Sequence, residues 1–433
     1  MTQQHTLTFF QKEHTIPIII INFVTITTKH KKTTIHMNKF LFSLLVAATA
    51  ASGAFAANEK RDSLGFVFTD VKVVKSTPVK NQAKSGTCWC FSGNSFLEDE
   101  ILRISGKEVD LSEMYIVRMC YIDKAKRYIR TNGFVHFNQG GSVLDNAYVW
   151  DLYGMMPEEA YKGLNYGEEL HNHSEMCDAM VAYLGQINRK PNRKLSTAWL
   201  RGLEGILDAY FGEVPATFTY EGKEYTPQSY AKSLGLDMNN YMAFTSYNHH
   251  PYNKPFALEV ADNWIWGQYM NVEMNDFKAI VDNAVENGYP VAWAADVSEK
   301  GFKWANGVAV IPAETNEKDL EGSELSRWVK LSEKEKQNER FNIKGPGKEI
   351  TVTPESRQEM FDNQETTDDH GMVIEGYATD QNGKRYYKVK NSWDSDHIYG
   401  GYFYVSEAYF LAKTLSILVH KDAVPKSVAK KLK

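Results

Sequence analysis

Residues 81–89 read N-Q-A-K-S-G-T-C-W, and this stretch decides the fold. Turn-forming residues before Cys88 and the apolar spacing after it predict a helix from Cys88 to Ser105, which Gly106 ends as a C-cap. Cys88 would lie in the first turn, where free backbone N–H groups and the helix dipole favour its thiolate. Gln82 precedes it by six residues, near enough for its amide to fold back over the thiol and donate to an oxyanion.

Two later segments supply the groups that a nucleophilic cysteine needs. Residues 369–377 (D-H-G-M-V-I-E-G-Y) place His370 at the start of an apolar strand, and residues 389–393 (V-K-N-S-W) place Asn391 at the end of another. Each residue alone is a weak signal, because a helix-start cysteine or a lone histidine is usually structural. As a set they indicate catalysis, because a nucleophilic cysteine requires an imidazole and a third group that orients it.

These segments resemble those of the papain-like cysteine peptidases, whose Cys-His-Asn triad has the same order. The resemblance implies a nucleophile, a base, an orienting residue, an oxyanion-hole donor, a tryptophan that shields the Asn–His pair, and a glycine pair that binds the substrate backbone. The residues that match these roles, in the same order, are Cys88, His370, Asn391, Gln82, Trp393, and Gly140 with Gly141.

Two departures from the family signature indicate one branch of the family. Ser85 replaces the first cysteine of the signature, so the disulfide usual at that place cannot form. Cys88 and His370 lie 282 residues apart, against about 130–150 in the signature family, so the chain must carry an insertion. Both features resemble the bleomycin hydrolase and aminopeptidase C branch, as do residues 249–252 (H-H-P-Y) and 391–397 (N-S-W-D-S-D-H).

The resemblance implies an α+β fold of the papain-like type, with a helical lobe and an antiparallel β-barrel lobe. We expect one peptidase domain over residues 57–433, with a large and mainly helical insertion at roughly 151–285. Residues 318–348 are strongly charged and are expected to form an exposed excursion. Local patterns agree with helices first and strands later; helices are expected at 196–210 and 275–286, and strands at 290–294, 386–390 and 402–405.

The first 56 residues are expected to be removed from the mature protein. Lys39 precedes the apolar run 40–48, and residues 54–56 (A-F-A) match an A-x-A cleavage pattern, as in a signal peptide cleaved after Ala56. The run is shorter than the ~20 residues of a membrane span. We therefore expect an exported protein, periplasmic or extracellular, with no membrane span. Met37 stands where a bacterial signal peptide would begin, so residues 1–36 are interpreted as an upstream extension; the alternative is a two-part leader.

Composition excludes several classes of protein. The 433 residues are 43% apolar and 24% charged, as in globular proteins. A net charge of −5 gives no reason to expect nucleic acid as a partner. Four cysteines are too few for a disulfide scaffold. Cys90 is about 200° round the helix from Cys88, so it is expected to face the core and not to act as a redox partner.

No metal or other cofactor is expected. His171, His173 and Cys177 form an H-x-H-x₃-C pattern, but no fourth ligand is nearby in the sequence, so a structural role is favoured. His249 and His250 could act in catalysis, although the resemblance places this pair in the inserted region.

The resemblance implies hydrolysis of peptide substrates through a cysteine thiolate and an acyl-enzyme, as in an aminopeptidase of the bleomycin hydrolase type. In that branch a C-terminal arm blocks the cleft, its carboxylate meets the substrate amine, and the subunits form hexamers. Here the arm is short and residues 424–433 are rich in lysine, so endopeptidase or dipeptidase-like cleavage is an alternative. A non-catalytic papain-fold interaction module would also fit the sequence, as would an acyltransferase or amidase that uses the same triad.

Overall fold

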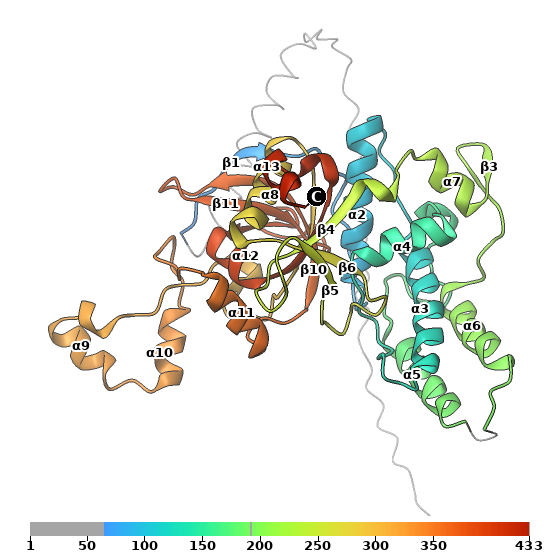
Figure 1. Ribbon diagram of the computed structural model, residues 1–433, viewed down its shortest axis with the longest axis horizontal. Helices are drawn as coiled ribbons and strands as arrows, with labels where there is room; N and C mark the ends of the chain where they lie inside the picture. Colours follow the sequence, from blue (N-terminus) through green and yellow to red (C-terminus); the bar gives the residue numbers. More distant parts are fainter. Residues whose placement is uncertain (1–64, 191–192, 433) are drawn as a thin grey trace, which may run out of the picture. The chain divides into compact units, whose positions relative to one another are not determined.

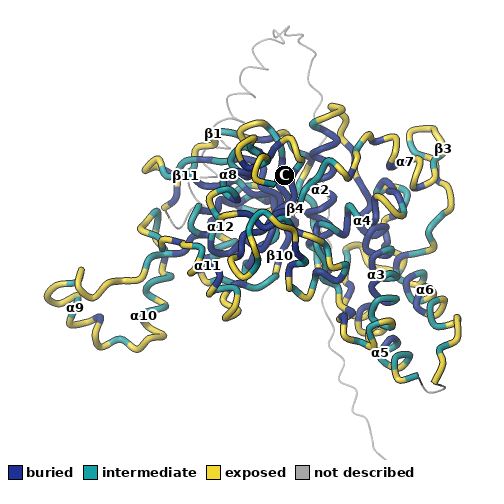
Figure 2. The backbone as a smooth tube through the Cα atoms, in the orientation of Figure 1, coloured by how far each residue is buried: buried dark blue, intermediate teal, exposed yellow. Residues whose placement is uncertain are grey.

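The helix that begins at Cys88 has the bounds that the sequence predicts. In the computed structural model, which describes residues 65–190 and 193–432, helix α2 spans Cys88–Ser105. Gly106 ends it at a φ of 72°, the left-handed conformation that glycine adopts readily. Thr87 precedes it, but within the described residues the Thr87 side chain makes no capping hydrogen bond. Helix α2 is buried along most of its length (Figure 2), so it is the central helix of the fold.

The described strands form one eleven-stranded sheet and a separate two-stranded hairpin, β2–β3. The order of the large sheet is β5-β6-β4-β13-β7-β10-β11-β12-β9-β8, and β1 pairs with β10 beside this path. The strands are β1 (Thr69–Val73), β2 (Phe218–Tyr220), β3 (Lys223–Tyr225), β4 (Tyr241–Thr245), β5 (Lys254–Ala257), β6 (Gln268–Asn271), β7 (Val291–Ala295), β8 (Phe302–Lys303), β9 (Val308–Ala309), β10 (His370–Thr379), β11 (Arg385–Lys390), β12 (Tyr402–Ser406) and β13 (Thr414–His420).

Helices lie on both sides of this sheet, with α3 to α7 gathered on one side in Figure 1 (cyan to green). The other helices are α3 (Glu113–Arg130), α4 (Leu144–Tyr153), α5 (Ser174–Asn188), α6 (Ala198–Phe211), α7 (Pro227–Ser233), α8 (Met274–Glu286), α9 (Gly322–Trp328), α10 (Glu333–Arg340), α11 (Pro354–Asp362), α12 (Glu407–Lys413) and α13 (Lys426–Lys431). Short 3₁₀ turns, such as Glu158–Ala160 and Met238–Asn240, connect some of them.

The two faces of the sheet bury two different apolar cores, because successive side chains of a strand point to opposite faces. In β7, Ala292 packs in the core that contains α2 to α6, whereas Val291 and Trp293 pack in the core that contains α8 and α12. Strand β10 repeats the pattern, with Val373 in the first core and Ile374 in the second. The central strands are therefore apolar on both faces, as in sheets that are covered on both sides.

A buried ion network fastens helix α2 to the sheet. Nζ of Lys390, at the end of β11, lies 2.7 Å from Oε1 of Glu375 in β10 and 3.2 Å from Oδ2 of Asp99 in α2. The same ammonium donates to the Thr77 carbonyl oxygen at 3.1 Å. All three charged side chains are almost fully buried, so each needs its partners. The network fixes the end of β11, and hence the position of Asn391, relative to the helix that carries Cys88.

The expectation of an antiparallel barrel is wrong for the described residues. The sheet is an open path that ends at β5 and β8, and its pairings β4–β6 and β9–β12 are parallel. The fold is nevertheless α+β, with mixed helix and sheet. The stretch 151–285 contains helices α5 to α8, but it also contains strands β2 to β6, which were not predicted from the sequence. Strands β4, β5 and β6 extend the main sheet.

The remaining local predictions agree with the structure to within a few residues. Helices α6 and α8 and strands β7, β11 and β12 occupy the expected segments. The charged segment 318–348 carries α9 and α10, which are largely exposed and project from the sheet in Figure 1 (orange). The leader expected at residues 1–56 lies outside the described residues. No helix in the described part of the chain is both long enough and apolar enough to cross a membrane.

Candidate active site

Cys88 opens helix α2 beside the first residues of strand β10. Its Sγ lies 4.0 Å from the carbonyl oxygen of Asp369, and Cys88 and His370 line the same pocket. Gly371 makes this approach feasible, because a Cβ there would lie 2.5 Å from Oγ of Ser92 and 3.2 Å from Cα of Trp89. The absence of a side chain at Gly371 therefore lets the first turn of the helix lie against the strand that carries the histidine.

His370 and Asn391 form a hydrogen bond that sets the imidazole tautomer. Nε2 of His370 lies 2.7 Å from Oδ1 of Asn391, and both residues are buried. The same Oδ1 accepts the backbone N–H of Ser392 at 2.8 Å, which fixes the orientation of the amide. Oδ1 can only accept, so Nε2 of His370 must carry the proton. A neutral His370 then has its lone pair on Nδ1, the nitrogen available to a thiol.

Trp393 and Gln82 flank this pair. The Trp393 ring lies over the imidazole of His370, with ring centroids 4.5 Å apart and planes inclined by 33°. Gln82 is buried; its Oε1 accepts from Oγ of Ser392 at 2.7 Å, and its Nε2 donates to the Ser85 carbonyl oxygen at 2.8 Å. One of the two N–H groups on Nε2 is thereby used, and the other is left for a further acceptor.

The glycine pair is tied to the start of helix α2. Nε1 of Trp89 donates to the Gln139 carbonyl oxygen at 2.9 Å. Gly141 lines the pocket of Cys88, and a Cβ there would lie within 3 Å of Trp89 atoms. Gly140 lies against Asp262, since a Cβ at Gly140 would overlap its carboxylate. Seven residues predicted from the sequence thus lie around the start of α2, the start of β10 and the end of β11; their roles stay predictions.

The electrostatics of the pocket favour an uncharged resting pair. Burial raises the pKa of Cys88 to about 11, against the lowering effect of the backbone N–H groups of Gly371 and Trp89. Burial also lowers the pKa of His370 to about 4, although the bond to Asn391 acts in the opposite direction. The sequence favours a thiolate here, but in the structure desolvation outweighs the helix N-terminus. At neutral pH the thiol and the imidazole are therefore both neutral before substrate binds.

Acidic side chains form one wall of the same pocket, and they were not singled out from the sequence. Asp262 and Asp368 line it together with Cys88 and His370. Burial first, and then the nearby carboxylates, Asp262 foremost, raise the pKa of Asp368 to about 7. Among the described residues, no cationic side chain lies within ion-pair distance of Asp262 or Asp368. The sequence signal was available for Asp368, which precedes His370 in a D-D-H run.

The other cysteine and histidine candidates lie elsewhere. Cys90 is fully buried, and its Sγ donates to the Glu113 carbonyl oxygen at 3.3 Å, in agreement with its predicted place in the core. The rings of His171 and His173 are 5.5 Å apart at their centroids. Burial lowers the pKa of His171 to about 4 and that of His173 to about 3. Both are therefore neutral at pH 7 and suited to packing.

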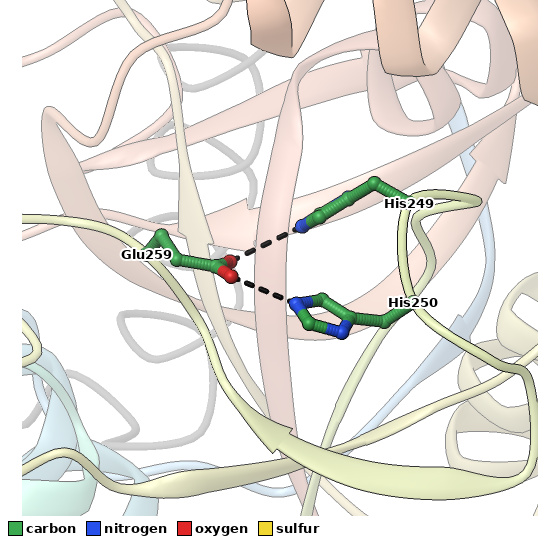
Figure 3. Close-up of side chains that lie close together, drawn as sticks. All are labelled: His249, His250 and Glu259. Atoms are coloured by element: carbon green, nitrogen blue, oxygen red, sulfur yellow. Dashed lines mark hydrogen bonds and ion pairs between the residues drawn. The ribbon is translucent and has the colours of Figure 1, made fainter.

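A different set of side chains has the geometry of a metal-ligand cluster. His249, His250 and Glu259 place one ligand atom each within 4.8 Å of one another, and no other group of this kind occurs among the described residues. Figure 3 shows both imidazoles pointing at the Glu259 carboxylate. The sequence drew attention to His249 and His250 but not to Glu259, which follows them by nine residues or more.

The residues of the C-terminal helix α13 do not line the pocket of Cys88. Helix α13 buries Val428 in the core that contains α8, and Nζ of Lys431 lies 2.6 Å from Oδ2 of Asp276 in α8. The residues of the last quarter of the chain that line the pocket lie just before β10, at its start, and in β13. In the described residues the lysine-rich segment is thus engaged with an acidic helix.

Comparisons with known proteins show which families and relatives the chain is similar to. Models of the Peptidase C1-like family and of the Papain family cysteine protease match residues 340–433 and 68–199, respectively. Aminopeptidase C of Lactobacillus delbrueckii subsp. lactis is 23% identical over 430 residues and covers 89% of each chain. Bleomycin hydrolase of Mus musculus is 24% identical over 418 residues and covers 84% of each chain.

A solved structure has the same fold. The crystal structure of PepW from Lactobacillus rhamnosis matches with a TM-score of 0.65 at 18% identity, over 88% of this chain and 86% of that one. The fold is therefore of the papain-like α+β type. The chain belongs to the papain family of cysteine peptidases, as a distant homologue, over most of its length, of the C1-like branch that contains aminopeptidase C and bleomycin hydrolase.

Proposed function

We propose that this protein hydrolyses peptide bonds as a cysteine aminopeptidase, with Cys88 as nucleophile, His370 as base and Asn391 as the residue that orients the base. One observation carries the proposal: the 2.7 Å bond from Nε2 of His370 to Asn391 leaves Nδ1 unprotonated in the pocket that holds the Cys88 thiol. A base that a third group orients, in the same pocket as a thiol, is the set of groups that nucleophilic catalysis requires.

The mechanism begins from the neutral pair. His370 accepts the thiol proton on Nδ1 as Sγ of Cys88 attacks the peptide carbonyl carbon, which gives a tetrahedral oxyanion and an imidazolium. The oxyanion accepts hydrogen bonds from the second N–H of Gln82 Nε2 and from the backbone N–H of Cys88. The C–N bond then breaks, and the imidazolium proton passes to the leaving amine. Water, deprotonated by His370, adds to the thioester, and the C–S bond breaks to release the acid and the thiol.

The acidic residues Asp262 and Asp368 favour a substrate that carries a positive charge near the bond to be cleaved. Asp262 and Asp368 face the pocket, and no cationic side chain among the described residues neutralises them by an ion pair. Burial raises the pKa of Asp262 and the Lys124 ammonium acts in the opposite direction, whereas Asp368 has only acidic neighbours among the groups that shift its pKa. A bound ammonium would add a positive charge beside both residues and would favour the ionised carboxylates. In the branch that this chain resembles, the carboxylate at the C-terminus of the arm meets the substrate amine. Here side-chain carboxylates would bind the α-ammonium group, and this selects peptides with a free amino terminus.

The test compares one peptide in two forms, with a free and with an acetylated amino terminus. We expect the purified protein to release the first residue from the free form and to leave the acetylated form intact. The Cys88→Ala variant, checked for an unchanged circular dichroism spectrum, should cleave neither. Cleavage of both forms would replace the aminopeptidase assignment by an endopeptidase. Turnover by the Cys88→Ala variant would refute the cysteine mechanism itself.

A further inference from the structure

The cluster of His249, His250 and Glu259 lies outside the proposed catalytic group but next to its pocket. Nε2 of His249 is 3.1 Å from Oε2 of Glu259, and Nε2 of His250 is 2.8 Å from Oε1 of the same carboxylate. Leu258 and Val260, on either side of Glu259, line the pocket of Cys88. The two histidines therefore bind Glu259, and the residues on either side of Glu259 line the pocket.

The hydrogen bonds of Gln358 determine the tautomer of His249. Oε1 of Gln358 accepts the backbone N–H groups of Asn248 at 2.8 Å and of His249 at 3.3 Å, while its Nε2 donates to Asp362 at 2.8 Å. These partners fix the amide orientation, because the flipped amide would turn its N–H groups toward N–H groups and its oxygen toward a carboxylate. Nδ1 of His249, 3.1 Å from Oε1, must therefore be the protonated nitrogen.

This tautomer creates a conflict at the other nitrogen of His249. In a neutral ring with the proton on Nδ1, Nε2 carries a lone pair, and that lone pair faces a carboxylate oxygen that also only accepts. Two acceptors at 3.1 Å need a positive charge between them, either a proton or a metal cation. A proton on His249 would satisfy this contact alone, whereas a cation between the three ligand atoms would bind both rings and the carboxylate together.

We propose that His249, His250 and Glu259 bind a divalent transition-metal ion of the Zn²⁺ type. Two imidazole nitrogens and one carboxylate oxygen are ligands that Zn²⁺ takes in proteins, and three protein ligands leave a fourth position for water. The bond from Nδ1 of His249 to Gln358 is the outer hydrogen bond that metal-binding histidines usually make. The exposed fractions of the three side chains, 29%, 36% and 54%, leave the ion a route from solvent.

The role of the ion would be to fasten one chain segment to another. His249 and His250 precede strand β5, and Glu259 follows it, so a shared ligand closes the loop around this edge strand of the sheet. Metal binding to the native state alone stabilises a fold in proportion to the logarithm of the free ion concentration. Zn²⁺ is therefore expected to raise the melting temperature of the full chain.

The experiment uses full-length protein that carries Cys88→Ala, because Cys88 is a free and only half-buried cysteine, and a thiol can itself bind Zn²⁺. After dialysis against a chelator and its removal, Zn²⁺ is titrated by calorimetry, and bound metal is measured after equilibrium dialysis. We expect one equivalent per chain and a higher melting temperature. Glu259→Gln and His250→Gln should each weaken binding at least tenfold. His136→Gln, at an exposed histidine elsewhere in the chain, should leave binding unchanged.

Two results would overturn the proposal. One is no uptake of Zn²⁺ by the parent protein, which would leave His249 as an imidazolium paired with Glu259. The other is equal uptake by the parent and by Glu259→Gln, which would place the ion elsewhere. The parent has no nucleophile, so neither result bears on the proposed peptidase activity.

Discussion

Oδ1 of Asn391 accepts both Nε2–H of His370, at 2.7 Å, and the backbone N–H of Ser392, at 2.8 Å. The second bond makes the first one informative, because an oxygen held by a backbone donor cannot be exchanged with the amide nitrogen. The imidazole is thereby locked with its free lone pair on Nδ1. Asn391 thus contributes to the proposed chemistry by fixing which nitrogen of His370 can accept a proton.

The first prediction concerns Asn391. In Asn391→Ala the imidazole loses the acceptor that holds its tautomer, so kcat should fall by roughly 10²-fold, while KM changes little. Asn391→Asp keeps an acceptor at the same place, so its activity should fall less than that of the alanine variant. Steady-state kinetics on one free-amine peptide measure both. Equal losses in the two variants would mean that Asn391 acts by packing and not through the tautomer.

The second prediction concerns Gln82 as an oxyanion donor. Gln82→Glu keeps an acceptor for the Oγ of Ser392 but removes the Nε2 donor, so kcat should fall about 10²- to 10³-fold. Ser392→Ala removes the anchor of the side chain and leaves the donor in place, so its loss should be smaller. Kinetics at saturating substrate separate the two effects. A larger loss in Ser392→Ala than in Gln82→Glu would show that the amide is not a donor to the reaction.

The helix at Cys88 could be predicted from the sequence because its signals are local. The turn residues before Cys88, the apolar spacing and the glycine at 106 all lie within one segment, and the structure has the helix at Cys88–Ser105. His370 and Asn391 were found by a different route, from motifs that resemble those of a family. Neither route gives distances, so the bond between them and the tautomer it sets came only from the structure.

The features that the sequence did not predict depend on distant parts of the chain. Strand β4 has only five residues, so its segment carries little pattern of its own. It pairs with β13, about 170 residues later, and this partner is not visible in the local sequence. Asp262 and Asp368 come together in one pocket only after the chain has folded. Glu259 and His249, on either side of strand β5, likewise come together only in the folded chain. The barrel was expected from family resemblance and is replaced by an open sheet. Local patterns therefore predicted elements, and tertiary pairing determined the sites.

The third prediction concerns the buried ammonium of Lys390. Lys390→Met removes the positive charge and leaves Asp99 and Glu375 buried without it, so the free energy of unfolding should fall by about 3–5 kcal/mol. Lys388, two residues earlier on the same strand, pairs with Asp70 near the surface, and Lys388→Met should cost less than about 1 kcal/mol. Urea denaturation compares the two variants. Similar losses in both would show that the buried network does not stabilise the fold.

The fourth prediction concerns the ionisation of Asp368, whose pKa is raised to about 7, first by burial and then by Asp262. The proposed ammonium site needs the ionised carboxylate, so kcat/KM for a free-amine peptide should rise as the pH increases through about 7. It should fall again above about 8, where an α-amino group loses its proton. In Asp368→Asn the rise near neutral pH should be absent, and kcat/KM should be lower, chiefly through a higher KM.

The same pKa also predicts how stability changes with pH. The native state keeps the proton of Asp368 up to about pH 7, whereas the unfolded chain releases it near the ordinary value of about 3.9. Unfolding is therefore favoured by proton release between these limits, and the contribution of this carboxyl to stability is lost as pH rises. The melting temperature of Asp368→Asn should exceed that of the parent by an amount that grows from about pH 4 to about pH 7 and is constant above.

Asp178→Asn, at an exposed acid on α5, is the control and should show no such growth. A melting-temperature difference between Asp368→Asn and the parent that is independent of pH would contradict the raised pKa, and with it the ionisation on which the proposed selection of amino termini depends.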